Sequence, residues 1–225
     1  MSIKLFSALA VRKALEDVVL DTFTGETGID VERNFDPTVQ LLKRIDAGEQ
    51  FDVMIGVTES FDALDAVVDR GTITPLAKAS LGLAVAGGAT QPDISTESGF
   101  VAALVGARSV AYSRSGASGI YFGGLIERLD IADVVRSRAT QLEKGFAAEA
   151  IVDGRADMAI QQLSELMFVP AVDIVGPFPA SLQQFTDFSA VVSRSARNRD
   201  ECLSLVRFLS SRVAKSAYLE TNLTL

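Results

Sequence analysis

The sequence predicts an α/β protein of two lobes, each lobe a mostly parallel sheet flanked by helices. Short apolar strand-like runs alternate with segments of helical periodicity from the first residues onward. Brief turns rich in glycine, proline and aspartate separate these segments, which favours parallel strands joined by covering helices. The chain has 225 residues, 48% of them hydrophobic, which is enough for one large domain or two small ones.

The first part of the chain predicts three strand–helix pairs. The expected strands are residues 3–6, 29–32 and 51–55, and the expected helices are residues 11–24, 36–48 and 59–69. Gly25 and Gly28 fit the end of the first helix. Asp36 fits a capping residue and Pro37 the first turn of the second helix.

The remainder predicts a second α/β unit and a return to the first. The expected elements are strands 81–86, 109–112, 158–161 and 188–192 and helices 96–105, 120–129 and 146–153, with two further helices at the end. We therefore expect a discontinuous arrangement with two crossings. Residues 1–80 and 181–225 would form lobe I, and residues 81–180 would form lobe II.

The composition excludes several kinds of chemistry. The chain has no histidine, which removes the usual general base, the commonest metal ligand and any Ser-His-Asp triad. The single Cys202 cannot form an internal disulfide and lies in an apolar-periodic run, where we expect it to be buried. Cysteine-based zinc binding is excluded, and no cofactor or metal is expected. The net charge of −8 argues against nucleic acid as a partner.

No targeting or membrane segment is visible. No run approaches the ~20 apolar residues of a membrane span, so no insertion into a membrane is expected. The first strand begins by Ile3, and charged residues from Arg12 onward interrupt any signal-peptide pattern. The expected location is cytoplasmic if Met1 is the natural start and periplasmic if a signal peptide has been removed.

Two turns of small residues indicate where a ligand could bind. The stretch 114–121 (RSGASGIY) follows a strand-like run and opens a helix-like one, and Ser7-Ala8-Leu9-Ala10 follows the first strand in the same way. Exposed backbone N–H groups at such turns favour an anion. The two turns predict two half-sites for a small anionic ligand, and ordinary loop chemistry is the alternative for each.

The order and spacing of these segments resemble the molybdate-binding-type extracellular solute-binding proteins. The resemblance rests on the opening strand and turn, on residues 24–31 (TGETGIDV), 41–48 (LLKRIDAG) and 51–55 (FDVMI), and on Ser118-Gly119-Ile120-Tyr121. It implies a type II periplasmic-binding-protein fold, in which two lobes joined by two crossings close on a ligand. It also implies delivery of a tetrahedral oxyanion to an ABC importer, with a permease as partner if the protein is exported.

Three departures from that family's pattern bear on the ligand. Ala10 stands where the family usually has a serine, and residues 36–38 (DPT) stand where it has serines. Gln161-Gln162 stand near a frequent tyrosine. Two hydroxyl donors to an oxyanion are thus missing, and amides both donate and accept. We therefore expect an organic carboxylate rather than molybdate or tungstate.

The resemblance implies a ligand shell, carried over position by position. Its members supply helix-terminal amides, hydroxyls, a guanidinium or side-chain amides: Ser7, Ala8, Ala10, Asp36, Thr38, Arg114, Ser115, Ser118, Gly119, Ile120, Tyr121, Gln161 and Gln162. The alternatives are a surface position for Arg114, a helix cap for Asp36 and a packing role for Tyr121.

Two functions remain open. The first is a receptor that closes on a small organic anion, for transport or sensing; an effector domain separated from a DNA-binding partner is a weaker version of it. The second is an isomerase or tautomerase of a di- or tricarboxylic acid on the same fold. Without histidine, its proton transfer would need a carboxylate, lysine or tyrosine. The candidates are Asp36, Tyr121, Lys144 and Glu165, with a helix cap as the alternative role for Ser164-Glu165. None of them is assigned as catalytic.

Overall fold

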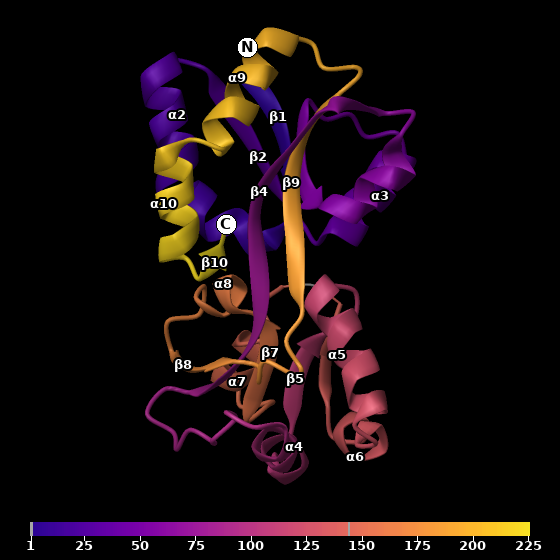
Figure 1. Cartoon of the computed structure of the whole chain (residues 1–225), viewed down its shortest axis with the longest axis vertical. Helices are drawn as coiled ribbons and strands as arrows, with labels where there is room; N and C mark the ends of the chain where they lie inside the picture. The colour runs from indigo at the N-terminus through magenta and orange to yellow at the C-terminus, as the bar shows by residue number, and fades with distance from the viewer. Residues whose placement is uncertain (1, 144) are drawn as a thin grey trace. The chain divides into compact units, whose positions relative to one another are not determined.

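The computed structural model describes residues 2–143 and 145–225, which form two compact units (Figure 1). Unit 1 comprises Met1–Ala79 and Thr186–Leu225, and unit 2 comprises Ser80–Phe185. The chain leaves unit 1 within the long strand β4 (Val68–Ala86) and returns within β9 (Phe185–Ser193).

The sheet of unit 1 has the strand order β2-β1-β3-β9-β4. Strand β1 (Ser2–Ser7) lies between β2 (Asp30–Phe35) and β3 (Val53–Val57) and is parallel to both. Strand β9 runs antiparallel to β3, and the short β10 (Leu223–Thr224) pairs antiparallel with β4. The carboxyl ends of β1, β2 and β3 therefore share one edge of this sheet.

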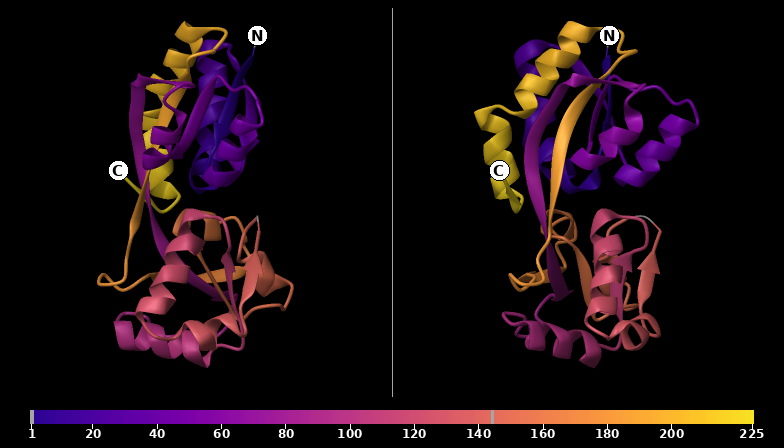
Figure 2. Two further views of the ribbon diagram at one scale, coloured as in Figure 1. Left: turned by 90° about the vertical axis from the view of Figure 1, so that its right-hand side faces the viewer. Right: turned by 45° about the vertical axis from the view of Figure 1, so that its right-hand side comes forward.

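Helices cover both faces of this sheet. The first helical stretch has four consecutive segments: η1 (Leu9–Val11), α1 (Arg12–Ala14), the π-helical η2 (Leu15–Val19) and α2 (Leu20–Thr27). It ends at Gly28, whose φ of 71° is left-handed, as expected for a helix stop. Figures 1 and 2 show α2 on the same side as α9 (Arg199–Leu209) and α10 (Arg212–Glu220), with α3 (Thr38–Asp46) on the other side.

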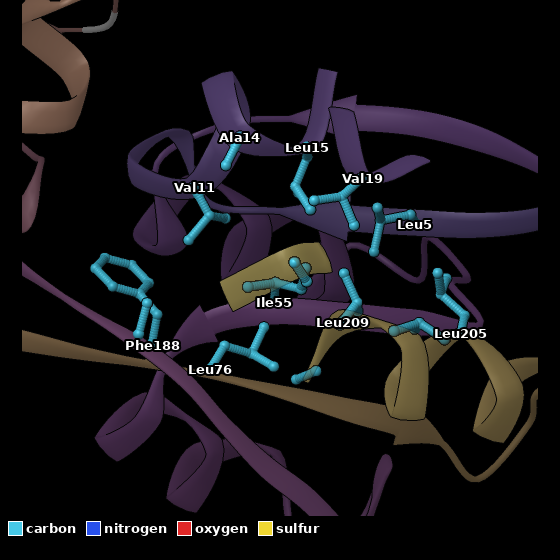
Figure 3. Packing of buried hydrophobic residues seen from close by; sticks show 14 of the residues in the cluster. Leu5, Val11, Ala14, Leu15, Val19, Ile55, Leu76, Phe188, Leu205 and Leu209 are labelled. Carbon is cyan, nitrogen blue, oxygen red and sulfur yellow. The ribbon is translucent and has the colours of Figure 1, made fainter. Parts of the chain in front are cut away.

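Alternation along the strands of unit 1 builds two apolar layers. Leu5 and Ile55 point to the layer that contains Leu15, Leu205 and Leu209 (Figure 3). Their chain neighbours Phe6 and Met54 point to the opposite layer, which contains Leu41, Phe51 and Phe61. Cys202 lies in the first layer and is 1% exposed, which confirms the expectation that it is buried.

Unit 2 has the same connectivity with different side chains. Its sheet order is β8-β4-β7-β5-β6, in which β5 (Val110–Ser113) lies between β7 (Met158–Gln162) and β6 (Thr140–Leu142) and is parallel to both. Strand β8 (Val172–Pro177) pairs with the other side of β4. The helices are α4 (Glu97–Gly106), α5 (Ala117–Arg128), α6 (Ala132–Arg136), α7 (Glu149–Val152) and α8 (Leu163–Leu166).

The two layers of unit 2 differ in composition. The layer against α4, α5 and α6 contains large side chains such as Phe100, Tyr112 and Phe122. The layer against α7 and α8 is rich in alanine, with Ala84, Ala111 and Ala159 supplied by the strands. Small side chains there let the helices approach the sheet closely.

The predicted α/β class is confirmed, and most predicted elements are present. One prediction was wrong: residues 59–69 do not form a regular helix, because η3 (Thr58–Leu64) is a 3-10 segment and Val68 already begins β4. The predicted strand 81–86 is only the second half of that 19-residue strand. The predicted helix 146–153 shortens to α7, and α6, β6, β8 and β10 were not predicted. The short helix expected near Ser164-Glu165 is present as α8, but both residues lie within it and Gln162 is its N-cap residue.

Candidate functional site

In unit 1, the turn after β1 is tightly bonded to its own sheet. Ser7 is fully buried, and its hydroxyl donates to the carbonyl oxygen of Ala8 at 3.2 Å. The Ala8 amide, expected to be available to a ligand, donates to the carbonyl oxygen of Ile55 at 2.9 Å. Ala10 is 1% exposed within η1. This turn therefore positions β1 against β3 and leaves fewer backbone donors for a ligand than the sequence suggested.

Asp36 and Thr38 occupy the turn before α3. The expectation that Asp36 caps this helix was wrong: Pro37 is the N-cap residue, and no side chain caps the helix end. The Asp36 carboxylate instead accepts a hydrogen bond from Arg44 Nη1 at 2.7 Å, because a charge-assisted bond to guanidinium is stronger than a neutral cap. Thr38 is 9% exposed and its Oγ1 accepts from the Val57 amide at 3.3 Å, which leaves the hydroxyl able to donate.

An ion-pair network, not foreseen from the sequence, surrounds this edge of unit 1. Arg44 donates to Glu49 Oε1 at 2.7 Å and Oε2 at 2.8 Å, and Lys4 donates to Glu49 Oε1 at 3.0 Å. Hydrogen bonds from Arg44 and then Lys4 lower the pKa of Glu49 to about 2. The same bonds raise the pKa of Arg44, whose guanidinium lies 4.4 Å from the centre of the Phe6 ring. The network fixes α3 on β1 with its charges compensated.

In unit 2, helix α5 starts in close contact with the end of β5. The Gly116 amide donates to Ser113 Oγ at 2.9 Å. A Cβ atom added to Gly119 would lie 1.6 Å from the Ser113 carbonyl oxygen, so only glycine fits there. The amides of the first helical turn, which include Ser118 and Gly119, have no carbonyl four residues earlier in the helix to bond. The structure thus places a helix N-terminus at the carboxyl end of a central parallel strand.

Other predicted members of this turn bond to neighbouring segments of unit 2. Arg114 is exposed and pairs with Glu143 Oε1 at 3.0 Å. The Ser115 hydroxyl donates to the Glu143 carbonyl oxygen at 2.9 Å. Tyr121 donates to the carbonyl oxygen of Leu182 at 2.9 Å, a packing role. The side chain of Ile120 is 58% exposed, and its amide donates within the helix to Gly116 at 3.0 Å.

The two predicted glutamines at the end of β7 have different environments. Gln161 bonds to the segment after β6: its Oε1 accepts from the Ala147 amide at 2.7 Å, and its Nε2 donates to the Gly145 carbonyl oxygen at 3.3 Å. Gln162 is 2% exposed, and within the described part of the chain its Oε1 accepts no hydrogen bond. Gln161 therefore stabilises the segment after β6 against the end of β7, whereas Gln162 Oε1 is an acceptor that no described residue uses.

Ser164 and Glu165, which follow β7 in the chain, lie at the same edge of the sheet. Ser164 is fully buried, and in the ranges 2–143 and 145–225 its Oγ has no hydrogen-bond partner. Glu165 is 8% exposed; burial raises the pKa of its carboxyl to about 8, and a hydrogen bond from Gln161 acts in the opposite direction. The sequence signal for burial was weak, consisting of the apolar residues Leu163 and Leu166 on either side.

The other candidate for proton transfer, Lys144, lies outside the described residues. Among the residues that are described, no group of three or more acidic, cysteine or histidine side chains is arranged to hold a metal ion. The helices in the same part of the chain include none that is long and apolar enough to cross a membrane.

Two α/β units, linked by two crossings and with strand ends and helix starts sharing an edge, define the type II periplasmic-binding-protein fold. A family model described as bacterial extracellular solute-binding protein matches residues 3–221. The chain belongs to this family, as the sequence resemblance predicted.

Individual relatives differ in what their names say they bind or convert. The chain is 31% identical over 183 residues to an aconitate isomerase from Pseudomonas sp., a match that covers 80% of this chain and 70% of that protein. It is 23% identical over 205 residues to the molybdate-binding protein ModA of Escherichia coli (strain K12), covering 87% and 79%. The periplasmic molybdate-binding protein of Azotobacter vinelandii has a similar fold, with a TM-score of 0.82, 19% identity and coverage of 100% and 99%.

Proposed function

We propose that this protein binds a small organic polycarboxylate at the carboxyl-terminal strand edge of unit 2. The supporting observation is the unpartnered Gln162 Oε1 at the end of β7, together with the buried Glu165 three residues further along the chain. A fully deprotonated oxyanion offers only acceptors, whereas Gln162 Oε1 needs a donor. A polycarboxylate with a hydroxyl or an undissociated carboxyl supplies both kinds of group.

In this proposal, the first turn of α5 in unit 2 receives a ligand carboxylate. The amides of Ser118 and Gly119 donate to it, and the positive end of the helix dipole favours its charge. In unit 1, the Thr38 hydroxyl is the candidate for a ligand contact of that unit, because its Oγ1 accepts from the Val57 amide and its proton can still be donated. As a receptor of its family, the protein would pass the ligand to an ABC permease.

A second function, isomerisation of the bound acid, is favoured by the 31% identity to an aconitate isomerase. Aconitate is an unsaturated tricarboxylate, which falls within the ligand class proposed from the strand edges. Both functions require binding of the polycarboxylate, so one binding experiment tests this requirement for both.

That experiment is calorimetry and thermal denaturation with a ligand panel. The panel contains cis- and trans-aconitate, citrate, tricarballylate, molybdate, tungstate, sulfate and phosphate. A ligand at about 100 times its dissociation constant stabilises the fold by about 2.7 kcal/mol. For a chain of this length, that corresponds to a rise in melting temperature of roughly 5–11 °C. We expect this rise with a polycarboxylate and none with molybdate; the reverse would refute the proposal.

Matched variants assign the contribution of each unit. We expect Gln162→Met in unit 2 to weaken binding roughly tenfold, because it removes the side-chain acceptor at the proposed contact, and Thr38→Val tests whether the hydroxyl of unit 1 contributes. Ser98→Ala, at an exposed position on α4, is the control and should leave affinity unchanged. Unchanged affinity in the Thr38 variant would confine the site to unit 2.

A further inference from the structure

The junction between β7 and α8 contains three buried polar residues, Gln162, Ser164 and Glu165. They are 2%, 0% and 8% exposed, respectively. Gln162 Oε1 and Ser164 Oγ have no hydrogen-bond partner among the residues that the structure describes. Buried polar atoms without partners are few in native proteins, because each costs about 1–3 kcal/mol. This junction therefore offers hydrogen bonds that the surrounding chain does not use.

Glu165 is buried, and within residues 2–143 and 145–225 no cation pairs with it. Only two influences act on its pKa: burial, which raises it to about 8, and a hydrogen bond from Gln161, which lowers it. At pH 7 roughly one molecule in ten then holds this group as a carboxylate, and the rest hold it as an acid. A carboxyl in this state can both accept and return a proton near neutral pH.

The position of Glu165 is that of a site residue. Strands β7 and β5 are parallel neighbours, with Tyr112 paired to Ile160, so the junction after β7 and the start of α5 lie on one edge of the sheet. Gln161 in the junction accepts a hydrogen bond from the Ala147 amide, and Ser115 in the turn before α5 donates one to the Glu143 carbonyl oxygen. A ligand carboxylate held at α5 would therefore lie at the same edge of the sheet as Glu165.

Few other groups could move a proton at neutral pH. The chain has no histidine. Burial raises the pKa of Cys202 to about 12 and also raises that of Tyr218, and both lie in the apolar core of unit 1. Asp36 is paired with Arg44. Tyr121 is bonded to the carbonyl oxygen of Leu182.

We propose that Glu165 is the catalytic acid–base of an isomerase reaction on an unsaturated polycarboxylate, with Gln162 and Ser164 binding the reacting part of the ligand. This proposal rests on the proposed binding of a polycarboxylate. It assigns a chemical role to the second of the two functions above.

In the proposed reaction, a proton moves from the ligand to Glu165 and then returns to the ligand. The Glu165 carboxylate removes a proton from the methylene carbon next to the double bond, so a C–H bond breaks and an O–H bond forms. The electron pair delocalises over the three-carbon allylic system into a ligand carboxylate, and the former double bond becomes free to rotate. Return of the proton from Glu165 restores the neutral carbon framework as the other geometric isomer, with no other reactant consumed.

The test combines two readouts on the full chain. The first incubates each protein with trans-aconitate in deuterium oxide, and proton NMR follows methylene exchange and isomer formation; calorimetry measures binding in parallel. The second follows the carbon-13 carboxyl signal of Glu165 in the ligand-free protein from pH 5 to pH 9. The variants are Glu165→Gln, Ser164→Ala and, as a matched control, Glu97→Gln at an exposed position in the first turn of α4.

We expect the wild type to exchange and isomerise, with a rate that increases with pH through about 8. Glu165→Gln should reduce both rates about 100-fold or more while binding persists at pH 7, because the amide resembles the undissociated acid. Ser164→Ala should raise KM more than it lowers kcat, and the control should match the wild type.

The contradicting outcomes are distinct. Binding without exchange in the wild type, or equal rates in Glu165→Gln, would overturn the role of Glu165 and leave polycarboxylate binding intact. No binding to any polycarboxylate would overturn the proposed function and this reaction together. A Glu165 carboxyl that titrates near 4.5, its ordinary value, would overturn the role of Glu165 whatever the ligand.

Discussion

The two units treat a glutamate in opposite ways: Glu49 of unit 1 is partly exposed and paired with cations, whereas Glu165 of unit 2 is buried. In unit 1, Glu49 is held by Arg44 and Lys4, and its pKa falls to about 2. In unit 2, Glu165 is buried, the amide of Gln161 is its one hydrogen-bond partner among the described residues, and its pKa rises to about 8. The order of the central parallel strands is alike in both units, but Glu49 precedes β3 and Glu165 follows β7, so the difference comes from the side chains around each glutamate.

This contrast indicates a division of roles between the units. A carboxylate held between two cations is fixed in one charge state at physiological pH and serves as scaffold. A carboxyl shifted toward neutrality can change its charge state, which is typical of groups that do chemistry. The network around Glu49 therefore serves as scaffold within unit 1, whereas the carboxyl of Glu165 in unit 2 changes its charge state near neutral pH.

The largest expected effect is a pH-dependent stability difference between the wild type and Glu165→Gln. The folded state keeps a proton on Glu165 up to about pH 8, whereas the unfolded chain releases it near pH 4.5. The wild type should therefore lose stability relative to the variant as pH rises, by about 1.4 kcal/mol per pH unit. Urea denaturation from pH 5 to pH 8 should show a relative loss of about 4 kcal/mol. A constant difference would mean that Glu165 is solvated.

A smaller effect is expected from filling the contact between α5 and β5. Gly119→Ala should destabilise unit 2 by about 1–3 kcal/mol or more, because the new Cβ would lie 1.6 Å from the Ser113 carbonyl oxygen. Gly123→Ala in the same helix has no atom within 4 Å of its new Cβ and should be neutral or stabilising by up to about 1 kcal/mol. Thermal denaturation of the two variants measures this difference, and equal melting temperatures would refute the close contact.

The smallest effect should come from the network of unit 1. Glu49→Gln should destabilise the protein by at most about 1 kcal/mol at pH 7, because the pair is partly solvated. The lowered pKa means that the stabilisation is present above about pH 4.5 and is lost as pH falls toward 2. Denaturation curves at pH 7 and pH 3 check both the size and the sign, which is opposite to that for Glu165. A penalty that grows in acid would contradict the network.

Much of the fold could be predicted from local patterns. Strands β1, β3 and β5 follow compact apolar runs, and the end of α2 follows from Gly28. The failure at residues 59–80 has a physical cause. The sequence of strand β4 includes Gly71 and Pro75, and buried and exposed residues are interspersed in its first half. That half therefore has no continuous apolar run in the sequence. The spacing of apolar residues at 59–69 also fits a helix, although those residues form a 3-10 segment and a strand start.

The candidate site could be predicted only in outline. The small residues of 114–121 correctly marked a strand-to-helix turn, because the need for Gly119 is a local property of the backbone. The partners of Asp36, Arg114 and Gln161 depend on residues up to 29 positions away, which sequence periodicity does not report. The shifted pKa of Glu165 arises from burial by several elements, and no pattern of residue types encodes it.

The burial of Cys202 has a practical consequence. Because its pKa is raised to about 12, only about one Cys202 thiol in 100,000 is ionised at pH 7. Reagents that react with thiolates will therefore not modify this residue. A cysteine introduced on the surface of either unit would then be the only position that such a reagent modifies. One spectroscopic probe per unit could thus be attached without first removing the native thiol, and the separation of the two probes would report how the units respond to a ligand.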